Sequence, residues 1–371
     1  MRAIEQRAVQ AYRDQFHDDP MTTASSPGRV NLIGEHTDYN EGFVLPCAID
    51  RRVAVAMGNG TRGLYSADYR EERKAGGCRE GSWADYPRAV AWALADAGHA
   101  VPRIQATFAG DVPLAAGLSS SAAVEGATAL ALNDFGQLGL SKLDLAILCR
   151  RAENGFIGVN SGIMDQYASL LCTAGHALLI DCRSLEARSV PLALEPAGLS
   201  LVVCNTRVER KLGTTGYNDR RASCERAAKS LGVTSLRDAT LADLDRLDGD
   251  DRRRARHVVT ENARVLAAVD ALERNDFHAF GELMFSSHES LRDDYEVSVP
   301  QLDLFVDVAR RADATGARLT GAGFGGCAVA LAPLRSVDRL TAMVNDEFAD
   351  RQFDQPELYT FQPSDGGDVT Q

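Results

Sequence analysis

The sequence has very little lysine. Lys supplies only four of the 40 basic residues, at positions 74, 142, 211 and 229, and Arg supplies the rest. None of these lysines lies in the G-x-x-x-x-G-K-[ST] pattern, in which loop NH groups and an ammonium group hold a nucleotide phosphate. The sequence therefore excludes a P-loop nucleotide-binding protein, and any phosphate must be held by other groups.

Cysteine pairs and long apolar runs are also missing. The eight cysteines are scattered without a C-x-x-C pair, so we expect reduced, mostly buried thiols. No stretch approaches the length of a membrane span. Charged residues, among them Glu5, Arg7 and Asp14, occupy the N-terminus where a signal peptide would carry an apolar segment. We therefore expect a cytoplasmic protein that makes no contact with a membrane.

The charge balance is acidic, with a formal net charge of −12. An acidic surface repels nucleic-acid phosphates and anionic lipids, so neither is an expected partner. Apolar residues make up 45% of the 371 residues and charged residues 25%, as in folded globular proteins. A chain of this length usually forms more than one core, so we expect two domains. Its oligomeric state cannot be read from the sequence, and a monomer is the starting expectation.

Apolar spacing predicts a mixture of helices and strands without a regular βαβ rhythm. Apolar residues between Ile4 and Phe16 recur at helical spacing and predict an opening helix. Further helices are expected over 119–132, 141–153, 220–231, 253–273 and 299–314. Strands are expected over 30–33, 43–49, 53–57, 104–108, 177–181, 201–205, 317–320, 327–331 and 358–362. This pattern favours an α+β fold over a doubly wound sheet.

Local signals predict several boundaries. Ser141 and Asp144 form a capping-box pattern at the start of the 141–153 helix, which we expect to end at Asn154-Gly155. A Pro- and Gly-containing stretch over 189–199 predicts a domain boundary, with one domain over 1–195 and a second over 196–371. The tail from Pro363 is expected to fray.

Two motifs look like nucleotide signatures but lack the required context. Gly321, Gly323 and Gly326 form G-x-G-x-x-G, but the following run is strand-like, whereas a dinucleotide fingerprint needs a helix there. Asp134-Phe135-Gly136 spells the DFG of protein kinases, but the partner motifs of that family are absent. We expect the second motif to be the C-terminal turn of a helix.

The segment 117–123 reads Gly-Leu-Ser-Ser-Ser-Ala-Ala and opens the expected 119–132 helix. A helix N-terminus offers unpaired backbone NH groups and a positive dipole, both of which suit a polyphosphate. Serine hydroxyls there can donate to phosphate or bind a magnesium ion. The alternative is a serine that only caps the helix.

A dense polar cluster follows the expected strand at 30–33. Glu35, His36 and Asp38 supply several acceptors within four residues, which suits a ligand with many hydroxyl groups, such as a sugar. The alternative is a polar turn whose carboxylates satisfy local backbone NH groups.

These segments resemble the motifs of a known kinase family. Residues 28–40 resemble the signature of the galactokinase family, and 117–123 resemble the phosphate motif of the wider galactokinase–homoserine–mevalonate–phosphomevalonate (GHMP) kinases. The segment 319–327 resembles the third motif of that wider family, and 162–166 and 291–297 resemble further parts of it. The resemblance extends from about residue 20 to residue 335.

The resemblance implies a fold and a reaction. The fold would be an α+β two-domain kinase of the galactokinase/mevalonate kinase type. Its N-terminal domain would resemble ribosomal protein S5 domain 2, and its C-terminal domain would be ferredoxin-like. The reaction would transfer the γ-phosphate of ATP to the C1 hydroxyl of α-D-galactose, giving galactose 1-phosphate and ADP, with Mg2+ as cofactor.

The resemblance also implies roles for single residues. Asp165 matches the catalytic carboxylate, as base or as orienter of the hydroxyl, and Arg29 matches its partner. The implied sugar contacts are Glu35, His36, Thr37, Asp38, Gly162 and Tyr217. The implied ATP contacts are Ser66, Ala115, Ala116, Gly117, Leu118, Ser119, Ser120 and Ser121. The implied magnesium ligands are Ser121 and Glu153, a hydroxyl and a carboxylate that fit this ion.

The sequence departs from the family pattern at Ala115 and Ala322, where relatives often have Gly. A methyl group there restricts the backbone near phosphate if a positive φ is required. Two other functions stay open. One is a kinase of a related sugar, such as N-acetylgalactosamine, galacturonate or arabinose. The other is a non-catalytic sugar and ATP sensor, which the complete serine loop and Asp165 argue against.

Overall fold

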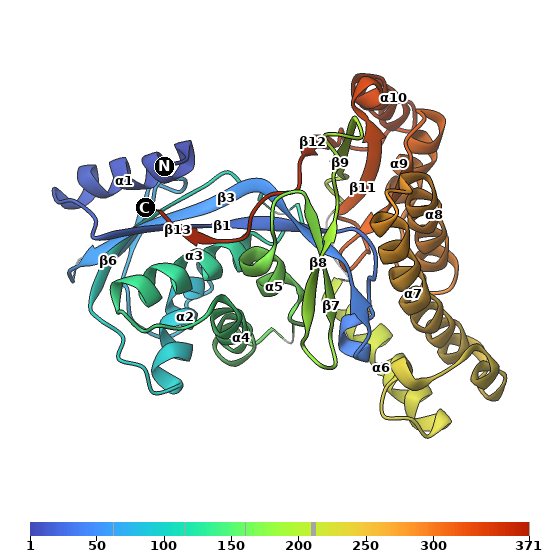
Figure 1. The fold of residues 1–371 in the computed structure, drawn as a ribbon, viewed down its shortest axis with the longest axis horizontal. Coiled ribbons are helices and arrows are strands. Elements are labelled where there is room, and N and C mark those ends of the chain that lie inside the picture. The colour runs from blue at the N-terminus through green and yellow to red at the C-terminus, as the bar shows by residue number, and fades with distance from the viewer. Residues whose placement is uncertain (62, 115, 160, 209–212, 371) are drawn as a thin grey trace.

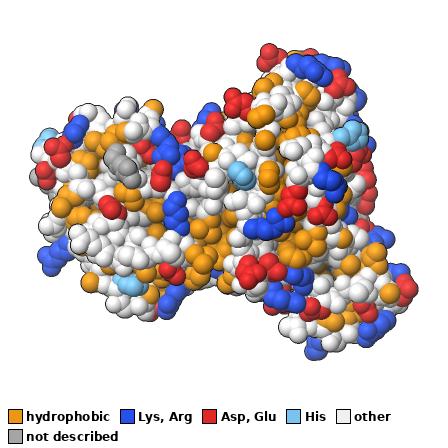
Figure 2. Space-filling model, in the orientation of Figure 1, with side chains coloured by type: hydrophobic (Ala, Val, Ile, Leu, Met, Phe, Trp, Pro, Cys, Tyr) orange, Lys and Arg blue, Asp and Glu red, His pale blue; other side chains and the backbone are white. Residues whose placement is uncertain are grey.

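A computed structural model of the chain describes residues 1–61, 63–114, 116–159, 161–208 and 213–370. Figure 1 shows two halves, each built on a sheet with helices packed against it. On the face drawn in Figure 2, acidic and basic side chains are interspersed. Among the described residues, no helix combines the length and the apolar character that crossing a membrane requires.

The first half is built on a six-stranded sheet with the order β13-β1-β3-β6-β4-β5, in which only β4 and β6 pair in parallel. Its strands are β1 (Thr22–Asn31), β3 (Pro46–Asn59), β4 (Leu64–Ser66), β5 (Glu71–Arg73), β6 (Ile104–Gly110) and β13 (Asp368–Val369). The helix α1 (Ala3–Phe16) lies on one face, where Ala8 and Tyr12 pack against Ala54 and Ala56.

On the opposite face of this sheet, two helices pack directly against the strands and two more pack against those helices (Figure 1). They are α2 (Asp85–Asp96), α3 (Ser120–Phe135), α4 (Lys142–Ala152) and α5 (Met164–Leu171). A small sheet of β2 (Phe43–Val44), β7 (His176–Asp181) and β8 (Ala187–Pro191) lies beside them. Because both faces of the main sheet are covered, β1 is buried along its whole length although most of its side chains are polar or small.

The second half contains an antiparallel sheet with the order β10-β11-β9-β12. Its strands are β9 (Leu199–Asn205), β10 (Gly316–Thr320), β11 (Cys327–Pro333) and β12 (Glu357–Phe361). Its helices are α6 (Gly213–Leu231), α7 (Gly249–Glu273), α8 (Phe277–Asp293), α9 (Pro300–Arg311) and α10 (Val337–Asp350). Alternate residues of β9 serve two cores, since Leu201 and Val203 join the core of the first half while Val202 and Cys204 pack under the helices.

Most elements expected from the sequence are present. The opening helix, the 104–108 strand, the strand after the third glycine motif and the helical turn at Asp134–Gly136 are confirmed. The mixed, mainly antiparallel architecture confirms the α+β class. The domain boundary at 195 stays a prediction. Six of the eight cysteines are buried, and none of the described ones forms a disulfide.

Several predictions of element bounds are wrong. The strand expected at 30–33 is β1, which begins at Thr22 and ends at Asn31. The strands expected at 43–49 and 53–57 are instead the short β2 and the 14-residue β3, which continues through Asp50 and Arg51. The helix expected to end at Asn154-Gly155 continues as a π-helical turn (Glu153–Ile157) and ends at Gly158, where φ is 79°. In addition, the sequence did not predict the helices α2, α8 and α10 or the strands β4, β5, β8 and β13.

The expectation of a frayed tail is also wrong. After β12 the chain returns to the first half, where β13 pairs with β1 beside the N-terminus (Figure 1). Backbone bonds hold this segment, including Ser364 N to Ala48 O at 3.0 Å and Thr370 N to Thr23 O at 2.8 Å. Composition alone predicted a loose end because none of these partners is near the tail in the sequence.

Candidate active site

The predicted catalytic pair, Arg29 and Asp165, is in contact. Arg29 lies near the end of β1, and Asp165 lies in the first turn of α5. The Arg29 Nε and Nη2 atoms lie 2.8 and 2.7 Å from Asp165 Oδ1, and Arg29 Nη1 donates to the Gly117 carbonyl at 2.7 Å. The Arg29 side chain is 8% exposed and that of Asp165 is 30% exposed. The carboxylate is therefore the member of the pair that a substrate hydroxyl can reach.

A bulge in β1 brings Arg29 against the serine loop. The register of β1 against β3 shifts between Pro27 and Arg29, and the Arg29 NH donates to the Leu118 carbonyl at 3.0 Å. A Cβ at Gly28 would lie 2.6 Å from that same oxygen, so only glycine permits this approach. The strand and the loop are thus joined by both backbone and side chain.

Ser119 contacts the Asp165 carboxylate instead of capping its own helix. Its Oγ donates to Asp165 Oδ2 at 2.5 Å, and the described residues provide no side-chain cap for α3. Ser119 has a φ of 55°, a left-handed conformation that costs free energy in a residue other than glycine. The first NH groups of α3 therefore remain available to an anion.

The rest of the predicted ATP loop divides into two sets. Ser120 and Ser121 are partly exposed in the first turn of α3, whereas Ala116 and Leu118 are buried and hold the loop to the core. Ala115 lies outside the described residues. Ser66 lies at the end of β4, where its buried hydroxyl accepts a hydrogen bond from the Tyr69 NH at 3.2 Å.

Glu153, the predicted magnesium ligand, belongs to a buried polar cluster. Its Oε2 accepts hydrogen bonds from Ser161 Oγ at 2.6 Å and from Gln166 Nε2 at 2.8 Å. Gln166 also contacts the buried Glu125 at 3.3 Å, and Glu125 Oε1 has no hydrogen-bond partner among the residues that the structure describes. Burial raises the pKa of Glu153 and of Glu125. The Glu125 oxygen and the serine hydroxyls in the first turn of α3 are oxygen ligands of the kind that a hard divalent cation prefers.

The described residues contain no group of three His, Cys, Asp or Glu side chains arranged to hold a metal ion by themselves. Magnesium takes few ligands from protein when it is also bound to nucleotide phosphates. The assignment of Ser121 and Glu153 as its ligands stays a prediction.

Asp38 and Gly162 are brought together, as the sugar-site prediction requires. A Cβ at Gly162 would lie 2.3 Å from Asp38 Oδ2, so the turn before α5 passes directly over this carboxylate. Burial, with the negative charges of Asp165 and Glu35, raises the pKa of Asp38 to about 6. The charges of Asp38 and Asp165 therefore interact.

Both carboxylate oxygens of Glu35 are occupied by the protein. Oε1 accepts from the Gly321 NH at 2.6 Å and from Thr320 Oγ1 at 3.2 Å, and Oε2 accepts from Arg318 Nη1 at 2.6 Å. Burial raises the pKa of Glu35, and the Arg318 guanidinium opposes that shift. Glu35 thus ties the sugar segment to the third glycine motif, and a sugar hydroxyl would share it with these donors.

The ring of His36 is held by protein on both sides. Its Nε2 lies 3.2 Å from the Ala322 carbonyl, which can only accept, so this nitrogen carries the proton. Burial lowers the pKa of His36 to about 3, so the ring is neutral and Nδ1 accepts from Tyr39 at 2.9 Å. Tyr39 in turn accepts from Tyr295 at 2.7 Å. This chain orients the imidazole and fixes its tautomer.

Thr37 and Tyr217 complete the predicted sugar set. Thr37 is buried, and its hydroxyl lies 2.7 Å from the Gly34 carbonyl and 2.6 Å from that of Phe43, so it closes the turn. The ring of Tyr217, on α6, packs 5.7 Å from His36 and 5.2 Å from Tyr39 between centroids. The predicted sugar residues therefore form one cluster around Asp38 and His36.

Sequence reasoning missed the residues that support this cluster. Arg318 is fully buried, and Glu261 on α7 accepts from the Gly34 NH at 2.9 Å and from Ser287 Oγ at 2.6 Å. His257, also on α7, lies 3.1 Å from the Glu35 carbonyl. The one available signal was an arginine in the apolar 317–320 strand, directly before the third motif.

Comparisons with known proteins agree with this architecture. Residues 10–59 match the galactokinase galactose-binding signature, 85–173 the N-terminal domain of GHMP kinases, and 268–350 the C-terminal domain of GHMP kinases. The solved structure of a mevalonate kinase shares the fold, with a TM-score of 0.66 and 18% identity over 92% of this chain and 99% of that one. The fold and the site thus define a GHMP kinase.

Proteins with higher sequence identity to this chain show which family of GHMP kinases it belongs to. A galactokinase of Streptomyces coelicolor is 45% identical over 98% of each chain, and one of Mannheimia succiniciproducens is 40% identical over 97% of each. The crystal structure of Lactococcus lactis galactokinase complexed with galactose has a TM-score of 0.90 and 32% identity, over 97% of this chain and 98% of that one. The chain belongs to the galactokinase family, whose members are ATP-dependent sugar kinases, as the motifs predicted.

Proposed function

We propose that this protein transfers the γ-phosphoryl group of ATP to the C1 hydroxyl of α-D-galactose, giving galactose 1-phosphate and ADP. The observation that carries the proposal is the Asp165 carboxylate, held at Oδ1 by Arg29 and at Oδ2 by Ser119 beside an uncapped helix N-terminus. A fixed acceptor for a hydroxyl thus lies next to an anion site, which is the arrangement that phosphoryl transfer requires.

In the proposed reaction, each of these residues has its own role. Asp165 accepts the hydrogen bond of the C1 hydroxyl, and either takes its proton or only orients it, because the proton can leave late in a loose transition state. The oxygen then attacks phosphorus in line, and the bond to the ADP oxygen breaks. Arg29 supplies positive charge beside the transferring group. The first NH groups of α3, from Ser120 onward, hold phosphate oxygens.

The sugar would lie over Asp38, Gly162 and Tyr217. The negative charge of Asp165 helps to raise the pKa of Asp38, and the missing side chain at Gly162 lets the turn before α5 lie against the Asp38 carboxylate. Glu35, His36 and Thr37 would line the side of the sugar site, and their side chains mainly form hydrogen bonds within the protein.

Ser121 and Glu153 would hold magnesium, which neutralises charge on the phosphates when bound. The hydroxyl of Ser121 lies in the first turn of α3, and Glu153 faces the start of α5 through Gln166. Cytoplasmic location and a monomeric state remain predictions.

The test is ADP release from the purified protein with Mg-ATP and each of galactose, N-acetylgalactosamine, galacturonate, arabinose and glucose. We expect turnover with galactose, lost in Asp165→Asn while ATP binding persists. Turnover with one of the other sugars but not with galactose would identify a different substrate and leave the proposed mechanism unchanged. Binding of galactose and ATP without turnover would favour the sensor, and wild-type turnover in Asp165→Asn would refute the site.

A further inference from the structure

The C-terminal segment 363–370 crosses from the second half of the molecule to the catalytic half. Its last residues add β13 to the edge of the first sheet, where Asp368 pairs with Ser25 and Val369 with Ala24 of β1. The same strand, β1, carries Arg29. The tail is therefore in direct contact with an element of the catalytic pair.

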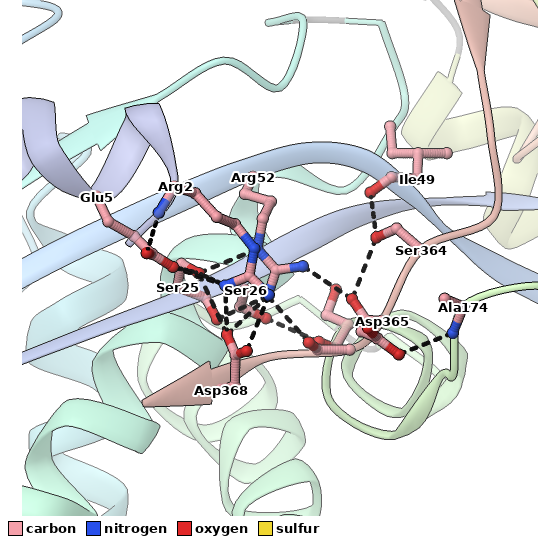
Figure 3. A network of polar contacts seen from close by, with 12 residues as sticks. Arg2, Glu5, Ser25, Ser26, Ile49, Arg52, Ala174, Ser364, Asp365 and Asp368 are labelled. Carbon is pink, nitrogen blue, oxygen red and sulfur yellow. Dashed lines mark hydrogen bonds and ion pairs between the residues drawn. The ribbon is translucent and has the colours of Figure 1, made fainter. Parts of the chain in front are cut away.

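The buried Arg52 holds the tail in place through hydrogen bonds and an ion pair (Figure 3). Arg52 of β3 donates to the Asp365 carbonyl at 2.8 Å and to the Gly366 carbonyl at 2.9 Å, and its side chain is 6% exposed. Asp368 forms ion pairs with Arg52 at 3.2 Å and with Arg2 at 2.9 Å. These contacts fix the tail backbone from Asp365 to Asp368.

Between these anchors, Gly366 and Gly367 cap the end of the catalytic helix. The Gly366 NH donates to the Cys172 carbonyl at 2.7 Å, and the Gly367 NH donates to the Ser169 carbonyl at 2.8 Å. The Ser26 hydroxyl of β1 donates to the same Ser169 oxygen, also at 2.8 Å. The tail thus satisfies carbonyl groups that the last turn of α5 leaves without helical partners.

The contact is too close for a side chain. A Cβ at Gly366 would lie 2.5 Å from the Leu170 carbonyl oxygen. A Cβ at Gly367 would lie 2.6 Å from Leu130 Cδ1 and 3.0 Å from Ser26 Oγ. Gly366 therefore allows the tail backbone to lie directly on α5, while Gly367 lies against the side chains of Leu130 on α3 and Ser26 on β1.

The geometry connects this contact to the active site. One helical turn separates Ser169 from Asp165 in the eight-residue α5, and only two residues lie between Ser26 and Arg29 in β1. At the C-terminal end of α5, the Ser169 carbonyl oxygen accepts hydrogen bonds from both the tail and β1. At the N-terminal end of α5, the Arg29–Asp165 pair joins the helix to β1. A shift of α5 at its end would change the position of Asp165.

We propose that Gly366 and Gly367 are positioning residues, through which the C-terminal tail holds α5 against β1 and sets the Arg29–Asp165 geometry. The inference rests on the proposed transfer at Asp165. A misplacement near 1 Å can lower a rate by about 100-fold, so the effect should appear in kcat. The KM values for galactose and Mg-ATP should change much less, because the tail meets α3 at Leu130, more than two turns from the helix N-terminus, and no contact among the described residues joins it to Asp38.

The test compares full-length wild type with Gly367→Ala and with Gly76→Ala. Gly76 is a matched control because a Cβ there would meet nothing within 4 Å. We expect Gly367→Ala to lose at least about tenfold in kcat, with both KM values within about threefold of wild type, while Gly76→Ala is unchanged. Circular dichroism and the melting temperature establish the folded fraction.

An unchanged kcat in folded Gly367→Ala would overturn the inference, even if its melting temperature fell, because the tail would then serve stability alone. If Gly367→Ala does not fold, Ser26→Ala decides in the same assay, since it removes one donor to Ser169 without adding atoms. In that variant a lower kcat supports the inference, and an unchanged kcat overturns it. Absence of galactose turnover in the wild type would instead refute the proposed function.

Discussion

The Ser119 hydroxyl donates a hydrogen bond to Asp165 Oδ2, with 2.5 Å between the two oxygen atoms. Arg29 donates to the other carboxylate oxygen, Oδ1. Ser119, directly before the first turn of α3, thereby helps to hold the carboxylate that we propose to be catalytic. Its left-handed backbone, with φ at 55°, turns the side chain away from its own helix. Ser119 therefore connects the predicted phosphate loop to Asp165.

Ser119→Ala should therefore lower kcat. A hydrogen bond to a charged group contributes about 1.5–3 kcal/mol, which corresponds to a loss of about 10- to 100-fold. Steady-state kinetics with galactose and Mg-ATP measure it. Ser141→Ala is the control, because Ser141 accepts from the Asp144 NH at the exposed start of α4 and contacts no site residue. Equal kcat values for the two variants would contradict this role.

Asp38 should make stability depend on pH. Its pKa is raised from 3.8 to about 6 in the folded protein, so the folded state holds this proton more tightly than the unfolded chain. The stabilisation is present below about pH 4 and is lost as pH rises through about 6. We expect Asp38→Asn to raise the melting temperature more at pH 8 than at pH 5, and to weaken galactose binding.

Thermal scans at both pH values and calorimetry with galactose measure these effects. Asp346→Asn, at an exposed position of α10, is the control and should show the same difference from wild type at both pH values. If Asp38→Asn behaves in the same way, Asp38 does not titrate in this range. If galactose affinity is also unchanged, Asp38 is not a sugar contact.

Much of the site could be predicted from the sequence because its motifs are local. The resemblance of residues 28–40 and 162–166 placed Arg29 opposite Asp165, and the structure joins them. It did not indicate that Ser119 would contact Asp165, because that contact depends on the backbone conformation of one residue.

The parts that sequence reasoning missed depend on distant partners. The polar strand β1 is buried because helices and strands cover it on both faces, and β3 continues through a charged stretch because Arg52 finds buried acceptors in the tail. The tail itself is ordered by Arg2, Arg52 and the end of α5. Local composition at these positions carries no sign of such partners.

Gly162 should tolerate no side chain. Because a Cβ there would lie 2.3 Å from Asp38 Oδ2, Gly162→Ala must displace either the carboxylate or the turn before α5. We expect the galactose KM to rise by about tenfold or more, as a site misaligned by part of an ångström loses binding and rate. Kinetics at saturating Mg-ATP measure it, with Gly76→Ala as the control. An unchanged KM would mean that Asp38 and Gly162 do not form the sugar site.

Arg318 should be the most costly charged residue to remove. Its guanidinium is fully buried, lies 2.6 Å from Glu35 Oε2, and connects the sugar segment to the strand before the third glycine motif. Arg318→Met leaves Glu35 buried without its counter-charge, which costs about 3–5 kcal/mol. The exposed Arg339, paired with Asp313 at 2.8 Å, is the matched control, and Arg339→Met should cost about 0–1 kcal/mol.

Urea denaturation of both variants measures the difference in unfolding free energy. Adding Glu35→Gln to Arg318→Met removes the uncompensated charge and should recover part of the loss, because the penalty comes from the buried carboxylate. Equal losses in Arg318→Met and Arg339→Met would show that the Glu35–Arg318 pair does not hold the two halves of the site together. A double variant less stable than Arg318→Met would show that Glu35 stabilises the fold through Gly321 and Thr320 instead.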